Sequence, residues 1–139
     1  LHESPASSMM ASRRIRVPQT TPSRNATESE AVADAFRASR SMTAELASPL
    51  SEEDCCVQSQ ACCSPVKWHL GHTTWFFERF ILRDALGMEP YDERFEFLFN
   101  SYYNAIGDRQ PRAQRGLLTR PGLGEIMAYR SVVDEHAPR

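Results

Sequence analysis

The sequence lacks any apolar run that approaches the roughly 20 residues needed to cross a bilayer, because Arg79, Arg83 and Asp84 interrupt the longest candidate. It also lacks an excess of charge of either sign. Its 16 basic and 18 acidic side chains give a net charge of -2, so nothing in it indicates nucleic-acid binding. With 139 residues and 41% hydrophobic composition, the chain has room for one domain with a core. We therefore expect a soluble globular protein in the cytoplasm, without a nucleic-acid or membrane partner.

Internal repeats and β-rich regions are absent as well, and three segments have the features of long helices. The first, residues 28–47, begins after the candidate cap Thr27 and ends at Ser48-Pro49, because proline cannot continue a helix. Its expected apolar face has three- and four-residue steps and contains Val32, Phe36, Ser39, Thr43 and Leu46. The last helix starts near Pro121 and runs through Val133. We expect an all-α antiparallel helical bundle with one long helix fewer than a four-helix bundle needs.

The central helix follows Ser64, a good N-cap, and Pro65, which suits the first helical position. Gly87 is its expected end. The helix carries a broad apolar surface, which predicts a position at the centre of the bundle. This surface is formed by Leu70, Thr73, Phe77, Phe80, Ile81 and Ala85, and is widened by Trp68, Trp75 and Phe76.

The remaining segments are predicted to be irregular. Residues 1–27 mix Ser, Pro, Thr and Arg without apolar periodicity, which indicates a disordered extension before a helical domain at 28–139. Residues 48–63 are expected to form a loop, and 107–116 an exposed one. The aromatic segment 94–106 is expected to be a short helix or an ordered irregular stretch, because a lone strand would have no ladder partner.

Two cysteine doublets, Cys55-Cys56 and Cys62-Cys63, precede the central helix. Four thiolates suit a zinc site, but neighbouring side chains of an extended chain point to opposite sides, so the four sulfurs would not easily converge. We favour reduced cysteines that partly fill an edge of the core.

The run SPVKWHLGHTTWFFERFIL at 64–82 resembles the DinB-like amino-terminal domain of the ergothioneine-biosynthesis sulfoxide synthases, the EgtB-type hercynine oxygenases. Three further segments carry the same resemblance, which spans about residues 29–135. They are PLSEEDCCVQS at 49–59, FNSYYNAIGDR at 99–109 and RGLLTRPGLGEIMAYRSVVD at 115–134.

The resemblance implies an enzyme that uses iron(II) and O2 to join the sulfur of cysteine or γ-glutamylcysteine to the imidazole carbon of hercynine. Members of that family hold iron with three histidines. The WHLxH pattern makes His72 one of them, and the other two lie on a HExQH helix that this sequence does not contain. The formylglycine-generating-enzyme-like domain that would be its carboxy-terminal partner is missing too. One imidazole cannot hold the ion, so this chain alone is expected to be inactive.

Three side chains are therefore candidate site residues, each with an alternative interpretation. His72 is a candidate iron ligand, although a lone histidine on an apolar face is usually a hydrogen-bonded core residue. Arg112 and Arg115 are candidate contacts to the carboxylates of the thiol substrate, because a guanidinium matches a carboxylate in shape and charge. Arg109 completes the trio of loop arginines, and a solvated loop would need no ligand. His69 is a candidate support for His72, or a partly exposed helix histidine.

Two other functions remain open at this point. The chain is a non-catalytic, truncated DinB-like helical module, or it is a selenoneine-type or other DinB-like metal-dependent thiol transferase. The latter would need its own complete set of metal ligands.

Overall fold

The computed structural model describes residues 24–138, and within them the chain is all-α, as predicted. Three long helices are joined by shorter elements, and no strand occurs in this range. The elements are α1 (Arg24–Ala47), α2 (Glu52–Cys56), α3 (Val66–Phe77) with the π-helical turn η1 (Glu78–Arg83), α4 (Arg94–Phe99), the 3-10 helix η2 (Arg112–Leu117) and α5 (Leu123–His136). None of the helices between residues 24 and 138 is long and apolar enough to cross a membrane.

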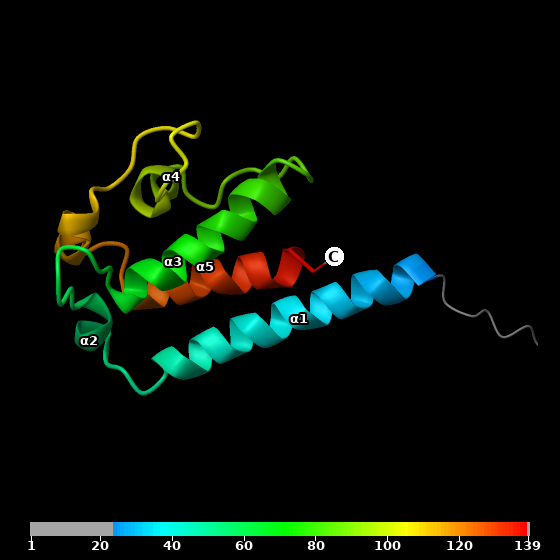
Figure 1. Cartoon of the computed structure of the whole chain (residues 1–139), viewed down its shortest axis with the longest axis horizontal. Helices are drawn as coiled ribbons and strands as arrows, with labels where there is room; N and C mark the ends of the chain where they lie inside the picture. The colour runs from blue at the N-terminus through cyan, green and yellow to red at the C-terminus, as the bar shows by residue number, and fades with distance from the viewer. Residues whose placement is uncertain (1–23, 139) are drawn as a thin grey trace, which may run out of the picture.

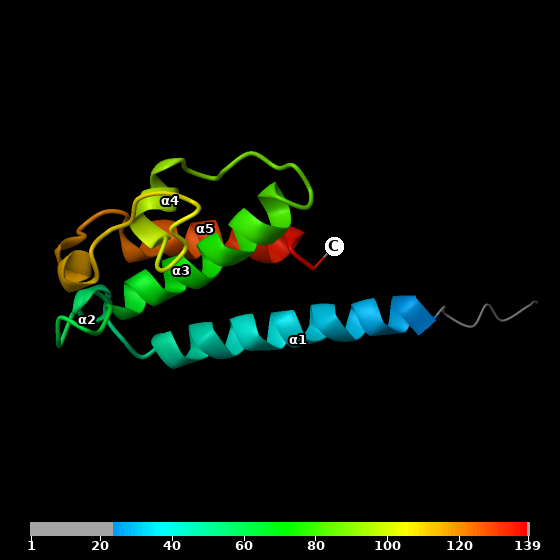
Figure 2. The ribbon, with the colours of Figure 1, turned by 45° about the horizontal axis from the view of Figure 1, so that its top comes forward.

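Helix α3 lies at the centre and packs against α2, α4 and α5. Figure 1 shows α3 and α5 side by side and running in the same direction, with α1 antiparallel to both. Figure 2 shows, from a second angle, that α4 and the segment after it cover the side of α3 away from α1. The crossover through α4 and η2 brings the chain back to the start of α3, which makes α3 and α5 parallel neighbours.

Both ends of the central helix differ from the prediction. The helix ends at Arg83 with Asp84 as its C-cap, before the expected end at Gly87. Gly87, with a φ of 68°, closes the turn that follows, and its N–H donates to the carbonyl of Arg83. At the other end the N-cap is Pro65, so the prediction of Ser64 as the cap is wrong. The hydroxyl of Ser64 instead accepts a hydrogen bond from Arg115.

The core is formed where α3, α4 and α5 meet, and its buried residues are Trp68, Leu70, Trp75, Leu82, Phe95, Phe99, Ile126, Tyr129 and Val133. The predicted apolar surface of α3 is only partly right, because Ile81 and Ala85 are exposed while Leu82 is buried. Gly71 lies directly under the ring of Phe99, and a Cβ at this position would overlap the ring. This glycine therefore allows α4 to approach α3 closely.

Helix α1 begins at Arg24, earlier than predicted, and residues 1–23 of the predicted extension lie outside the described range. The predicted apolar face of α1 is wrong in part, since Val32 and Leu46 are 71% and 73% exposed. Helix α1 makes an edge-to-face contact between Phe36 and Phe77, with ring centroids 4.7 Å apart, and Ala47 at its end packs against the core.

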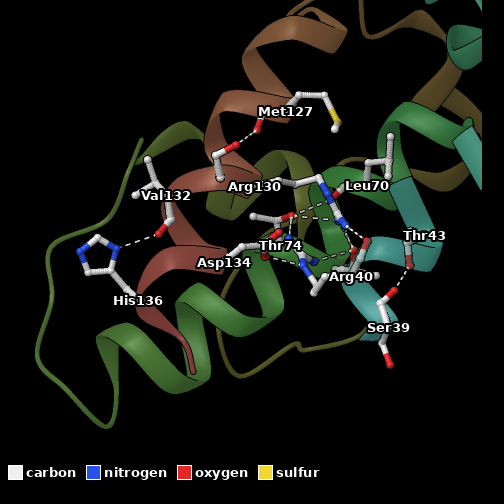
Figure 3. A network of polar contacts seen from close by, with 12 residues as sticks. Ser39, Arg40, Thr43, Leu70, Thr74, Met127, Arg130, Val132, Asp134 and His136 are labelled. Atoms are coloured by element: carbon white, nitrogen blue, oxygen red, sulfur yellow. Dashed lines mark hydrogen bonds and ion pairs between the residues drawn. The ribbon is translucent and has the colours of Figure 1, made fainter. Parts of the chain in front are cut away.

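A polar network completes the attachment of α1, as Figure 3 shows. Arg40 of α1 is 6% exposed. Its Nε donates to Asp134 at 2.5 Å and its Nη2 to Thr74 at 2.8 Å, while Arg130 donates to the carbonyl of Arg40 at 3.1 Å. One buried guanidinium thus connects α1 with both α3 and α5.

Candidate functional site

A cavity of about 630 Å³ opens between the loop after α2, the first turns of α3, the residues just after α4 and the 3-10 helix η2. Its volume falls within the range of roughly 300–1,000 Å³ that is usual for small-molecule sites. The cavity contains all three predicted site residues, and none of the described residues that line it is acidic. The lining consists of Ser59, Cys62, Cys63, Ser64, Trp68, His69, His72, Ser101, Tyr102, Arg112 and Arg115.

His72 is half-buried on α3, and its ring is stacked on Trp68 with centroids 4.7 Å apart and planes 13° apart. Its Nδ1 lies 2.7 Å from the backbone oxygen of Phe99. Because a carbonyl only accepts, Nδ1 carries the hydrogen and donates it, which leaves Nε2 as the other ring nitrogen. Burial is the main cause that lowers the pKa of His72, and the charges of Arg115 and His69 lower it further. The hydrogen bond to Phe99 raises the pKa but does not reverse the shift. At neutral pH the imidazole is therefore uncharged and Nε2 has a free lone pair.

This arrangement is the one in which histidines bind metals, with one nitrogen fixed by a carbonyl and the other available. His72 therefore fits the role of a single ligand. Within residues 24–138 no group of three or more His, Cys, Asp or Glu side chains is placed to hold a metal ion.

Arg115 occupies a different place from the one predicted, since the supposed exposed loop contains η2 and Arg115 is only 3% exposed. Its guanidinium lies 3.5 Å from the ring centroid of Trp68, and its Nη1 donates to Ser64 at 2.9 Å. Among the described residues its Nε has no hydrogen-bond partner, and no carboxylate forms an ion pair with it. Burial, with Arg112 and Arg109 nearby, lowers its pKa to about 10, so it still carries its charge at neutral pH. A buried cation without a counter-ion favours binding of an anion.

Arg112 stands at the rim of the same cavity. Its guanidinium lies 5.1 Å from the ring centroid of Tyr102, and its Nη1 is 3.5 Å from the carbonyl oxygen of Cys62. Arg109 is exposed, donates to Asn104 at 2.6 Å and does not line the cavity. The structure therefore brings two of the three loop arginines together and leaves the third outside.

Gln58 holds the two walls of the cavity together, and nothing in its sequence context indicated this. Its Nε2 donates to the carbonyls of Cys63 at 2.9 Å and Arg112 at 2.8 Å. Its Oε1 accepts from the backbone N–H of Gly116 at 2.6 Å. A single side chain thus fixes the cysteine-containing loop against η2.

The other histidines have separate positions. His69 lies on an exposed part of α3 and lines the cavity, and burial together with Arg115 and Arg112 lowers its pKa. His136 ends α5, where its Nδ1 bonds to the carbonyl of Val132 at 2.8 Å, outside the cavity.

The four free cysteines divide into two environments. Cys55 is buried, which raises the pKa of its thiol, and this residue alone matches the expected core position. Cys56 is half-buried and lines a smaller space beside Pro65. Cys62 and Cys63 are exposed, so their predicted place at the core edge is wrong, and both line the cavity with His72.

Residues 35–137 match the family model of the DinB superfamily. The match covers most of the 139 residues, including every side chain that lines the cavity. No curated protein matches the chain.

Proposed function

Because the chain belongs to the DinB superfamily, we propose that it is the amino-terminal part of a non-haem iron(II) sulfoxide synthase that joins a cysteine-type thiol to hercynine with O2. The observation that carries the proposal is the convergence of His72, Arg112 and Arg115 on one cavity. These residues come from segments far apart in the sequence, and the cavity size suits a small substrate.

His72 would hold iron through Nε2, since its Nδ1 is engaged by Phe99. Iron(II), when bound, supplies the activation of O2. The remaining ligands would come from residues other than those described, such as a HExQH helix. Trp68 and Trp75, whose ring centroids lie 4.7 and 6.0 Å from that of His72, hold the imidazole in place.

Arg112 and Arg115 would bind and orient the thiol through its carboxylates. Arg115 is fixed by Trp68 and Ser64 and needs little rearrangement to accept an anion, because its charge has no partner among the described residues. Arg112, at the rim, would attract the anionic substrate from solvent. With no acidic side chain in the described lining, the cavity favours an anion over a cation of similar size.

Reconstitution tests this function. The chain is combined with a polypeptide that carries a HExQH helix and the formylglycine-generating-enzyme-like domain, and then with iron(II), hercynine, γ-glutamylcysteine and air. We expect the thioether sulfoxide of hercynine by mass spectrometry, its loss in His72→Ala, and its retention in the control Arg109→Ala. Formation of the same product by the His72→Ala mixture would contradict the proposal, and absence of product with the wild-type chain would favour a non-catalytic DinB-like helical module.

A further inference from the structure

Two exposed thiols share the cavity with the two arginines, and the proposed function gives them no role. Cys62 and Cys63 both line the cavity of about 630 Å³ and are free. The Sγ of Cys62 lies 3.5 Å from the Oε1 of Gln60, a weak contact that leaves the thiol accessible. Cys63 precedes Ser64, whose hydroxyl accepts from Arg115.

The surroundings of this doublet select for negatively charged reagents. The guanidinium of Arg112 lies beside the backbone of Cys62, at 3.5 Å from its carbonyl oxygen, and Arg115 is a buried cation without a carboxylate partner among the described residues. The described lining contains no acidic residue that would repel an anion. A molecule that carries both carboxylates and a sulfur–sulfur bond could bind to the two arginines through its carboxylates while its disulfide lies close to the thiols of the doublet.

We propose that the Cys62-Cys63 doublet is a thiol–disulfide exchange site for carboxylate-bearing low-molecular-weight disulfides of the glutathione disulfide class. This inference rests on the proposed function only where Arg112 and Arg115 are assigned to carboxylates, and it requires neither His72 nor iron.

The reaction needs no other reagent. A cysteine of the doublet loses its proton, and its thiolate attacks one sulfur of the disulfide. The protein–sulfur bond forms as the sulfur–sulfur bond of the reagent breaks, and the departing thiolate takes up a proton. The protein sulfur is oxidised and the departing half of the reagent is reduced. The attached group would fill the cavity and exclude the free thiol substrate until a second thiol reversed the exchange.

The other doublet provides a matched control within the chain. Cys55 is fully buried, and Cys56 lines a separate, smaller space together with Lys67 and Arg115. An effect of nearby positive charge alone, or of a doublet as such, would include Cys56, whereas an effect of the open cavity would not.

The test treats the full chain, reduced and in the presence of a chelator, with glutathione disulfide or with the cationic disulfide cystamine. Adducts are located by peptide mass spectrometry, and rates are divided by those of the urea-unfolded chain to remove intrinsic reactivity. We expect adducts on the peptide that contains Cys62 and Cys63. The normalised rate with glutathione disulfide should exceed the rate with cystamine by about tenfold, which is the lower end of the rate enhancement that a charged cleft gives. Cys56→Ser should retain this preference, and Arg112→Ala should lose most of it.

Equal modification of Cys56, or an unchanged preference in Arg112→Ala, would overturn the inference. Binding of reduced γ-glutamylcysteine, measured by calorimetry on Cys62→Ser/Cys63→Ser, separates the two proposals. If the reduced thiol binds through Arg112 but the disulfides show no preference, this inference alone fails. If neither the binding of γ-glutamylcysteine nor the preference for glutathione disulfide depends on Arg112, the assignment of Arg112 to carboxylates is wrong, and both proposals fail.

Discussion

The Nδ1–H of His72 donates to the backbone carbonyl of Phe99 across 2.7 Å, and this bond leaves Nε2 as the imidazole nitrogen that carries no hydrogen. Phe99 is the last residue of α4, and Gly71 allows its ring to rest on α3. The position of α4 and the tautomer of His72 are therefore linked through one residue.

Stability is expected to depend on pH through His72. Its pKa is lowered from the ordinary value of 6.5, chiefly by burial, so below that pH the unfolded chain binds more protons than the folded one. The contribution of His72 to the free energy of unfolding should be level above about pH 7 and fall as the pH drops below 6.5. Thermal melts from pH 7.5 to 5.0 measure the slope.

His72→Asn identifies the source of that slope, because asparagine retains an N–H donor for Phe99 but does not titrate. The slope should decrease in His72→Asn and decrease further in His69→Asn/His72→Asn, since the pKa of His69 is also lowered by burial. A slope equal to that of the wild-type chain in both variants would contradict this assignment.

Binding of the thiol should depend on Arg112. Arg112→Ala is expected to raise the Kd of γ-glutamylcysteine by at least about tenfold, since the loss of one hydrogen bond to a charged group costs roughly 1.5–3 kcal/mol. Arg109→Ala, outside the cavity, is the matched control and should leave the Kd unchanged. Calorimetry that gave the same Kd for Arg112→Ala as for the control would exclude the arginine contact.

The attachment of α1 should depend on Arg40. Arg40→Ala removes its bonds to Asp134 and Thr74 and is expected to lower the free energy of unfolding by about 2 kcal/mol. Arg37→Ala breaks an exposed ion pair with Asp34 on the same helix and should cost less than about 0.5 kcal/mol. Hydrogen exchange should also show faster exchange of α1 alone in Arg40→Ala. Equal costs for the two variants would show that the network does not hold α1.

Gly71 should not tolerate a side chain. Gly71→Ala places a methyl group against the ring of Phe99, which is 2% exposed and packs edge-to-face on Phe95. Overpacking of this kind typically costs about 1–3 kcal/mol. Gly124→Ala is the comparison, because nothing lies within 4 Å of a Cβ there. Denaturant unfolding that gave both variants the same midpoint would contradict the close packing of α4 on α3.

Helix positions were predictable because they depend on local signals. Helix α1 ends at Ala47, directly before Ser48-Pro49, as expected. Gly87, with its positive φ, lies in the turn just after the central helix, which ends at Arg83. The segment 94–106 contains a short helix, with Phe95 and Phe99 buried one turn apart and Phe97 exposed. Local sequence determines these features, so they can be recognised without knowledge of the fold.

The cavity was less predictable because tertiary contacts determine it. Charge and lack of periodicity indicated an exposed loop around Arg115. In the structure Trp68, which lies far from Arg115 in the sequence, provides an aromatic face on which the guanidinium is buried. Gln58 joins two loops that are distant in the sequence. Val32 and Leu46 fit a helical apolar pattern, yet α1 reaches its neighbours through Phe36 and Arg40.

The most direct test is the iron(II) affinity of the chain together with the complementing HExQH polypeptide, measured anaerobically for wild type and His72→Ala. If His72 is a ligand, the alanine variant should bind iron at least about a hundredfold more weakly, since removal of groups that only orient a ligand already costs roughly 10–100-fold. The variant should still bind γ-glutamylcysteine, because Arg112 and Arg115 remain in place. Equal iron affinity of the two proteins would contradict the assignment of His72 as a metal ligand.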